Sequence, residues 1–288
     1  MQQAQGTRVL LRGVNVNYVE AGEGPAVLLL HGLGTSLVTW SRNIGPLVEA
    51  GFKVLALDLP GCGDSDKPKY LSYDPVAGAR LIQQFISALG VERLSLVGNS
   101  AGGLIVSLFA LSYPEKVDRL VLVGSGGLGY RVSWFLRIAS LPVLGDLIYH
   151  PRLQNGDGLV KRVFHRPPSF LPEVLPEMQR VRELPGSRRA ALQSIRSSIN
   201  LLGLRRDRYV LHRLQRSPVP LMIVWGEEDK VLPVSHAREV QQALPGCVVH
   251  IIPECGHWPH MEKAEEFNRL LTRFLGSALD AGSRAAGR

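Results

Sequence analysis

The sequence predicts an α/β fold: a mostly parallel β-sheet flanked by helices, with a helical segment inserted between two parts of the sheet. Short runs of β-branched and aliphatic residues alternate with helical patterns along the chain. The runs AVLLL, KVLAL, LSLVG and RLVLV are apolar throughout, as expected for parallel strands that helices cover on both faces. The alternation stops between Gly126 and Ser217, where the pattern is helical, rich in arginine and interrupted by prolines.

Each predicted element follows from a local pattern of apolar residues bounded by turn residues. Eight runs are candidate strands: Val9–Leu11, Val14–Val19, Val27–Leu30, Val54–Leu57, Leu94–Val97, Leu120–Val123, Leu221–Trp225 and Val248–Ile252. The candidate helices are Ile44–Glu49, Val76–Ala88, Ala101–Ser112, Ser235–Leu244 and Ala264–Leu275. We therefore expect one core formed by residues 1–126 and 217–280, a helical cap over 127–216, and a disordered tail over 281–288.

Positive charge is concentrated in the predicted cap. The whole chain carries a net charge of +8, and the stretch from Arg131 to Arg216 holds 16 Lys and Arg against 6 Asp and Glu. These arginines are scattered, and no recognised nucleic-acid-binding motif surrounds them. We therefore expect the charge to serve solubility, and we expect no nucleic-acid partner.

The sequence favours a cytoplasmic protein without stable membrane insertion. Its most apolar stretch begins at Val132 but contains Arg137, Pro142 and Asp146, which makes it a poor membrane span. The N-terminal residues MQQAQGTRVL lack the apolar core of a signal peptide. No dinucleotide-binding glycine motif and no cluster with metal-ligand spacing occurs, so we expect neither a cofactor nor a metal.

One serine lies between glycines where a strand pattern changes into a helix pattern. Gly98, Asn99, Ser100, Ala101 and Gly102 match G-x-S-x-G, in which a sharp turn exposes the serine above the sheet. The flanking glycines let strand and helix approach without a clash of Cβ atoms. The free N–H groups at the helix start would stabilise negative charge that forms beside the serine. Ser100 is therefore the candidate nucleophile.

A nucleophilic serine needs a base, and the base needs an acid that orients it. In this kind of sheet the acid follows a late strand, and the histidine follows the last one. Glu227, Glu228 and Asp229 come directly after one late strand, and each of them is a candidate acid. His257 follows the last strand and is the candidate base, with His260 as its competitor.

The loop His31-Gly32-Leu33-Gly34 follows the strand AVLLL and is the candidate oxyanion loop. Attack on a carbonyl group creates an oxyanion, which needs two preorganised N–H donors. We expect these donors to be the backbone N–H groups of Leu33 and Ala101. Gly32 and Gly34 would permit the close approach of the backbone, and we expect His31 to brace the loop.

These motifs identify a resemblance. The segments HGLGTS, DLPGCGDSDKP, GNSAGG, WGEEDKVLP and GHWPHMEKAEEFN resemble those of the α/β-hydrolase superfamily, and the resemblance runs from about Arg8 to Ala278. It implies an α/β-hydrolase fold with an eight-stranded sheet and an inserted cap. The family pattern W-G-x-x-D selects Asp229 as the catalytic acid. Relatives such as haloalkane dehalogenases and epoxide hydrolases use an aspartate nucleophile, and Ser100 argues against both.

The resemblance implies one of two activities. GNSAGG, SGGLG and CGHW followed by EFNRLL are similar both to carboxylesterases and to meta-cleavage-product hydrolases, which split carbon–carbon bonds. The latter use a cap arginine to hold the substrate, and Arg180 and Arg182 are candidates for that role.

We expect first a serine hydrolase of small to medium hydrophobic carboxylic esters that acts through an acyl-enzyme. Its acyl pocket would be lined by the apolar stretch from Val132 to Ile148. Carbon–carbon hydrolysis of ring-fission products is the alternative, and a ligand-binding module without turnover is the alternative from a different class. The sequence leaves the oligomeric state open.

Overall fold

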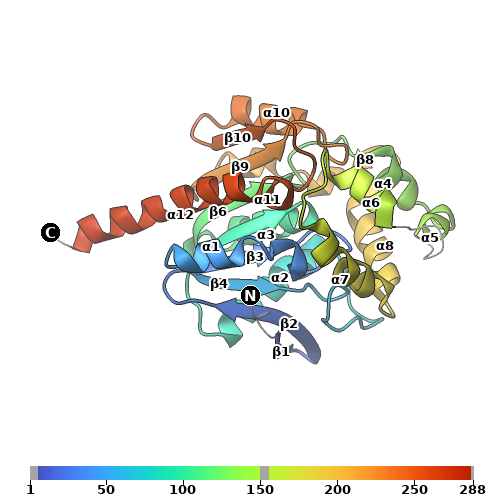
Figure 1. Cartoon of the computed structure of the whole chain (residues 1–288), viewed down its shortest axis with the longest axis horizontal. Coiled ribbons are helices and arrows are strands. Elements are labelled where there is room, and N and C mark those ends of the chain that lie inside the picture. The colour runs from blue at the N-terminus through green and yellow to red at the C-terminus, as the bar shows by residue number, and fades with distance from the viewer. Residues whose placement is uncertain (1–5, 150–155, 287–288) are drawn as a thin grey trace.

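A computed structural model of the chain describes residues 6–149 and 156–286, and an eight-stranded sheet lies at its centre (Figure 1). The strand order is β1-β2-β4-β3-β5-β6-β9-β10. Strand β2 is antiparallel to β1 and β4, and every pair from β4 to β10 is parallel, which confirms the mostly parallel sheet. The strands are β1 Thr7–Leu11, β2 Val14–Ala21, β3 Ala26–Leu30, β4 Lys53–Leu57, β5 Leu94–Asn99, β6 Val117–Val123, β9 Leu221–Gly226 and β10 Val248–Ile252.

Helices cover both faces of the sheet, and this explains why its central strands are apolar throughout. Side chains alternate between the two faces along a strand. Leu28 and Leu30 of β3 therefore belong to the core on the face that α2, α3 and α10 cover, whereas Val27 and Leu29 belong to the core on the face that α1 and α12 cover. These helices are α1 Ile44–Glu49, α2 Pro75–Ala88, α3 Ala101–Ser112, α10 Ser235–Ala243 and α12 Ala264–Ala286.

Shorter elements complete the core. The 3-10 turns η1 Leu37–Trp40 and η2 Pro114–Lys116 and the short helix α11 Pro259–Glu262 connect the longer elements. Helix α2 illustrates how the sequence sets a boundary, because the Asp74 carboxylate accepts the N–H groups of Val76 (2.8 Å) and Ala77 (2.9 Å). Pro75 occupies the first turn, where its missing N–H costs nothing.

The segment between β6 and β9, residues 127–216, is called the inserted segment below. Its helices are α4 Trp134–Ala139, α5 Leu144–Ile148, α6 Gly156–Val163, α7 Leu171–Glu183, α8 Ser187–Ser198 and α9 Leu211–Leu214, with the 3-10 turn η4 Arg206–Arg208. Helices α4 to α8 gather at one end of the molecule, beyond the sheet, whereas α9 packs with α3 in the core (Figure 1). The sequence predicts helices in this segment, and the structure adds a two-stranded hairpin of β7 (Ile199–Asn200) and β8 (Gly203–Leu204).

Two departures from the predicted elements have local causes. In the β7–β8 turn, Asn200 Oδ1 accepts the N–H of Leu202 at 2.9 Å, and Gly203 has a φ of +123°, which favours glycine. Helix α12 continues as far as Ala286, although the sequence predicts a disordered tail from residue 281. The segment is rich in alanine, the residue with the highest helix propensity. Residues 287 and 288 lie outside the described part of the chain.

A membrane-spanning helix is absent from residues 6–149 and 156–286, where no helix combines the necessary length with the necessary apolar character.

Two histidines are buried in the core without a hydrogen bond to either ring nitrogen within the described residues. His236 packs edge-on against Trp225, and His260 lies 4.3 Å from Trp40 between ring centroids. Burial lowers the pKa of His236 to about 4 and the pKa of His260 to about 3. Both rings are therefore neutral in the folded protein at pH 7.

We predict that stability falls as the pH drops below 6.5. The unfolded chain binds protons at these histidines near their ordinary pKa of about 6.5. The folded chain binds them only when the pH approaches the lowered pKa values, so acid favours the unfolded state. Each histidine contributes a slope of about 1.4 kcal/mol per pH unit in that window. Urea denaturation between pH 7 and pH 4.5 measures the slope. His260→Gln and His236→Gln should each make it shallower, and the exposed His212→Gln should not; equal slopes in all variants would contradict the prediction.

Candidate active site

The turn between β5 and α3 holds Ser100 in a strained backbone conformation. Ser100 has φ 54° and ψ −116°, in a region that residues with a Cβ rarely adopt. Its N–H donates to the carbonyl oxygen of Val123 (2.9 Å), and its carbonyl oxygen accepts the N–H of Gly126 (2.9 Å). The neighbouring β6 strand and the loop after it therefore impose the conformation of the serine, as expected where strain supports function.

The predicted glycines of this turn are required by close packing. A Cβ atom on Gly102 would overlap the carbonyl oxygens of Leu30 and His31, and one on Gly98 would lie 2.7 Å from the Gly102 carbonyl oxygen. Asn99 Nδ2 donates to the carbonyl oxygens of Val123 (3.0 Å) and His257 (3.4 Å). The serine turn is thereby tied to the loop that carries the histidine.

Ser100, His257 and Asp229 lie in one hydrogen-bonded line. The Ser100 hydroxyl lies 2.9 Å from His257 Nε2, and His257 Nδ1 lies 2.7 Å from Asp229 Oδ2. Asp229 Oδ1 accepts the N–H groups of Val231 (2.8 Å) and Leu232 (2.9 Å), which fixes the carboxylate in place. An ionised carboxylate only accepts, so Nδ1 carries the proton and Nε2 is free to take one from the hydroxyl.

The competing acids and the competing histidine lie elsewhere. Glu227 pairs with Arg238 at 3.2 Å on the surface, and Glu228 Oε2 accepts the N–H of Cys255 at 2.8 Å. His260 is in the core against Trp40, as described above. Only Asp229 among these three acids contacts the ring of His257 within the described residues.

Glu262 is a further residue that positions the histidine loop, and the sequence analysis did not find it. Its Oε2 accepts the N–H groups of Gly256 (2.8 Å) and His165 (3.1 Å), and its Oε1 accepts the N–H of Arg166 (2.5 Å). The N–H of His257 donates to Val163 O at 2.7 Å. The loop that carries the base is therefore built jointly by the core and the inserted segment.

The loop of residues 31–34 lies beside the serine, as predicted. Leu33, Ala101 and Ser100 line one cavity, so both expected N–H donors belong to residues that flank the hydroxyl. A Cβ atom on Gly32 would lie 3.2 Å from Ser100 Cβ, and Gly34 has a φ of +63°. Glycine at both positions lets the backbone approach the serine.

Residues just after β4 contact the start of this loop and the segment that follows it. The N–H of Leu59 donates to His31 Nε2 (3.1 Å), and His31 Nδ1–H donates to the Gly32 carbonyl oxygen (2.7 Å). Burial lowers the pKa of His31, in keeping with a neutral ring that accepts at Nε2. The N–H of Leu37 donates to Asp58 Oδ1 at 2.7 Å. His31 therefore braces the loop, and Asp58 is a second brace that sequence reasoning missed.

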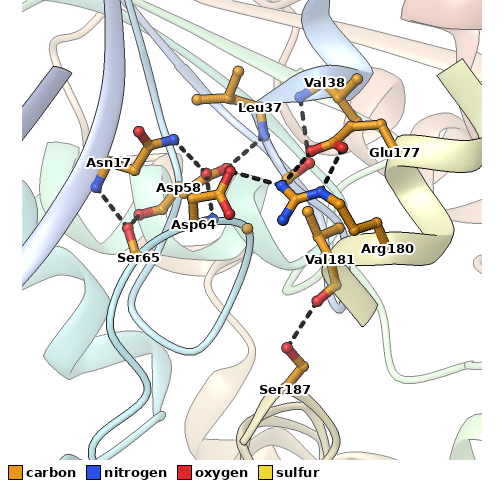
Figure 2. Close-up of polar contacts among 12 residues, drawn as sticks. Asn17, Leu37, Val38, Asp58, Asp64, Ser65, Glu177, Arg180, Val181 and Ser187 are labelled. Atoms are coloured by element: carbon orange, nitrogen blue, oxygen red, sulfur yellow. Dashed lines mark hydrogen bonds and ion pairs between the residues drawn. The ribbon is translucent and has the colours of Figure 1, made fainter. Parts of the chain in front are cut away.

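Asp58 is the centre of a buried polar network (Figure 2). Its Oδ2 accepts Asn17 Nδ2–H (2.7 Å) and the N–H of Asp64 (3.0 Å), while its carbonyl oxygen accepts the Ser65 hydroxyl (2.7 Å). Asp58 is 2% exposed, so these hydrogen bonds act in a low-dielectric environment. The carboxylate joins the loop after β4 to the start of η1.

The two candidate arginines on α7 have different surroundings. Arg180 is on the surface, where it pairs with Asp64 (2.7 Å) and Glu177 (2.6 Å), and it is absent from the cavity lining (Figure 2). Arg182 lines the cavity that contains Ser100 and His257. Arg162 of α6 lines the same cavity, with its guanidinium carbon 3.7 Å from the Phe135 ring centre, and the sequence analysis did not single it out.

This cavity has a volume of about 320 Å³ and lies between the core and the inserted segment. Its catalytic end is formed by Leu33, Ser100 and His257. Its other walls are mainly apolar and aromatic: Ser133, Trp134, Phe135, Leu136, Ile148, Tyr149, Val163, Val231 and Trp258. The stretch from Val132 to Ile148 therefore supplies pocket residues, as the sequence predicts. Within residues 6–149 and 156–286, no group of three or more His, Cys, Asp or Glu side chains could hold a metal ion.

A family model described as the alpha/beta hydrolase family matches residues 27–270. The chain belongs to this family. A hydrolase of 2-hydroxy-6-oxo-6-phenylhexa-2,4-dienoate from Comamonas testosteroni is 33% identical over 272 residues, which are 90% of this chain and 91% of the relative.

Solved structures of other alpha/beta hydrolases are similar over nearly the whole chain. A meta-cleavage product hydrolase from Pseudomonas fluorescens IP01 has a TM-score of 0.77 and 25% identity, and the match covers 95% of this chain and 98% of that one. A bacterial membrane phospholipase A has a TM-score of 0.77 and 32% identity, covering 95% of this chain and 86% of that one.

We predict that Asp58→Asn lowers kcat by about ten- to hundredfold and leaves KM nearly unchanged, because a displaced oxyanion donor costs up to about a thousandfold. Both carboxylate oxygens of Asp58 accept N–H groups. Whichever oxygen the amide NH₂ of asparagine replaces, a donor would therefore face another donor. Asp64→Asn is the matched control, since it removes a surface carboxylate but keeps the backbone N–H that Asp58 accepts. Steady-state kinetics with any substrate that the enzyme hydrolyses measures kcat and KM for the two variants. Equal effects of the two substitutions would refute the role of Asp58.

Proposed function

We propose that this alpha/beta hydrolase is a serine enzyme that hydrolyses a carbon–carbon bond in 2-hydroxy-6-oxo-dienoate substrates. One observation carries the proposal: the Ser100–His257–Asp229 line opens into a cavity that Arg162 and Arg182 also line. The names of the relatives favour this reaction over the ester hydrolysis that the sequence led us to expect first.

The proposed reaction uses the hydrogen-bonded line in two stages. The 2-hydroxyl proton of the substrate first moves to C5, which gives the 2,6-dioxo tautomer. Ser100 Oγ then attacks the 6-keto carbon while His257 Nε2 takes the serine hydroxyl proton, and the N–H groups of Leu33 and Ala101 stabilise the oxyanion. Collapse of this intermediate breaks the bond to the neighbouring carbon of the 2,6-dioxo tautomer. The electron pair enters the conjugated 2-oxo-ene unit, and the resulting dienolate takes the proton back from His257. Water, deprotonated by the same ring, then hydrolyses the acyl-serine ester.

The arginines suit the charge of such a substrate. Its carboxylate and the dienolate oxygen are negative, and burying negative charge in an apolar cavity is unfavourable unless cations or donors compensate. A guanidinium group supplies both a fixed positive charge and paired N–H donors for a carboxylate. Arg182 on α7 and Arg162 on α6 approach the cavity from different helices, so they can contact two acceptor groups of one substrate.

Ester hydrolysis is the second candidate function. It is favoured by the apolar walls that Trp134, Phe135, Leu136 and Trp258 contribute to the cavity, which suit an acyl chain. The similarity to a membrane phospholipase A supports the same alternative. An ester would use the same serine, histidine and oxyanion donors, with an alkoxide in place of the dienolate as leaving group.

A two-substrate comparison distinguishes the candidates. We predict that the wild-type enzyme consumes 2-hydroxy-6-oxo-6-phenylhexa-2,4-dienoate with a kcat/KM at least about a hundredfold above that for p-nitrophenyl butyrate, because the arginines would stabilise only the anionic substrate. Loss of the dienoate absorbance and release of p-nitrophenol measure the two reactions. Ser100→Ala should abolish both. Rapid ester cleavage with no consumption of the dienoate would overturn the carbon–carbon proposal in favour of the second candidate.

The arginine variants test the substrate class separately. We predict that Arg182→Gln lowers kcat/KM for the dienoate by about ten- to hundredfold, as expected for loss of a hydrogen bond to a charged group, and changes ester cleavage little. Arg180→Gln on the same helix is the matched control, because that residue is absent from the cavity lining. Thermal denaturation establishes that both variants fold. An Arg182→Gln enzyme that retains full dienoate activity would contradict the role of this arginine.

A further inference from the structure

The inserted segment has an exposed apolar surface that the proposed reaction does not use. Leu202 is 88% exposed, Val143 76% and Trp134 69%. The surface, called the apolar ridge below, consists of Tyr130, Trp134, Val143, Leu144, Leu147, Leu201 and Leu202, all of them exposed. Scattered apolar side chains are normal on a soluble protein, but a contiguous group of large ones indicates an interaction site.

The elements that carry the ridge contact one another. Helix α4 packs against both α5 and β7. Arg137 Nε of α4 donates to the carbonyl oxygen of Leu201 (2.5 Å). The N–H of Leu204 donates to the carbonyl oxygen of Tyr130 (2.9 Å). In Figure 1, α4, α5 and β8 lie together at the end of the molecule opposite the C-terminal end of α12. The elements that carry the apolar side chains therefore lie at one end of the protein.

The charges around the ridge are predominantly positive. Arg131, Arg137, Arg205 and Arg206 are exposed beside it. The acidic groups of the same elements are Asp146, which pairs with Arg188 (3.1 Å) and Arg196 (2.9 Å), and Asp207, which lies 3.5 Å from both Arg205 and Arg208. Each carboxylate is thus shared by two arginines. The surface favours a partner that is both apolar and anionic.

We infer that the apolar ridge docks on an anionic lipid surface. Leucine, valine and tryptophan side chains insert at the boundary between headgroups and acyl chains, and arginines beside them attract anionic headgroups. A second copy of the chain is a poorer partner, because a two-fold symmetric contact would bring the same arginines of both copies together. The inference holds whichever bond the enzyme hydrolyses.

Helix α4 connects the ridge to the catalytic cavity. Trp134 is exposed on the ridge and also lines the cavity, where Phe135 and Leu136 of the same helix join it. A docked enzyme would therefore hold its cavity beside the lipid phase, in which apolar substrates accumulate. Such a substrate could reach Ser100 from the lipid with little exposure to water.

Cosedimentation with vesicles tests the inference. The wild-type protein should bind vesicles of phosphatidylcholine and phosphatidylglycerol at least about tenfold more tightly than vesicles of phosphatidylcholine alone, as expected for several basic residues near the surface. The double variant Leu201→Asp, Leu202→Asp should lose that binding. The control is Leu10→Asp, which puts a single added aspartate on an exposed leucine of β1, outside the ridge. Hydrolysis of a water-soluble substrate by the double variant establishes that it is folded.

Tryptophan fluorescence supplies a second readout. Trp40, Trp225 and Trp258 are buried, so a blue shift on addition of anionic vesicles should come from Trp134 and disappear in Trp134→Phe. Three results would overturn the inference: no binding to anionic vesicles, equal loss of binding in Leu10→Asp, or a wild-type dimer that becomes monomeric in the double variant. The last result would make the ridge an interface between copies of this chain.

Discussion

The hydrogen bond between His257 Nδ1–H and Asp229 is the interaction on which the catalytic arrangement depends. At 2.7 Å, with both side chains almost completely buried, it fixes the tautomer that leaves Nε2 able to accept the proton of Ser100. The bond exists because β9 and β10 are parallel neighbours, so the loops at their C-terminal ends meet. Ser100 joins them from β5 through the pairing of β5 with β6 and of β6 with β9. The parallel sheet thus brings three residues that are far apart in the sequence into contact at one edge.

One buried and two partly buried carboxylates hold the loops that carry this site. Asp58 accepts the N–H of Leu37, at the start of η1 just after the candidate oxyanion loop, and an N–H of the loop after β4. Glu228 and Glu262 accept N–H groups of the histidine loop. Glycine-rich loops have little side-chain packing to define them, so charge-assisted hydrogen bonds to their backbone N–H groups supply the precision that catalysis needs. The inserted segment takes part because Glu262 of α11 also accepts the N–H groups of His165 and Arg166, so the histidine loop and the inserted segment are held together.

The parts of the structure that the sequence could predict are those with local signatures. Apolar runs located all eight strands of the sheet, most plainly β3 to β6, which are apolar throughout because helices cover both faces of a parallel sheet. The glycine pattern around Ser100 and the order of acid and histidine located the line of catalytic candidates. Asp58, Glu262 and Arg162 could not be found in this way, since their roles arise from contacts between distant segments. Arg180 and Arg182 are two positions apart on α7, and only the rotation of the packed helix distinguishes the surface residue from the cavity residue.

The most direct test of the central claim is labelling with a fluorophosphonate, which reacts with a serine only when a neighbouring base removes its proton. Mass spectrometry of the intact protein and of its peptides measures the extent, the rate and the site. The account predicts one adduct per chain, on the peptide that contains Ser100, and a rate at least about a hundredfold lower in Asp229→Asn, where the histidine adopts the wrong tautomer. Labelling at the wild-type rate in Asp229→Asn, or an adduct on another serine, would contradict it.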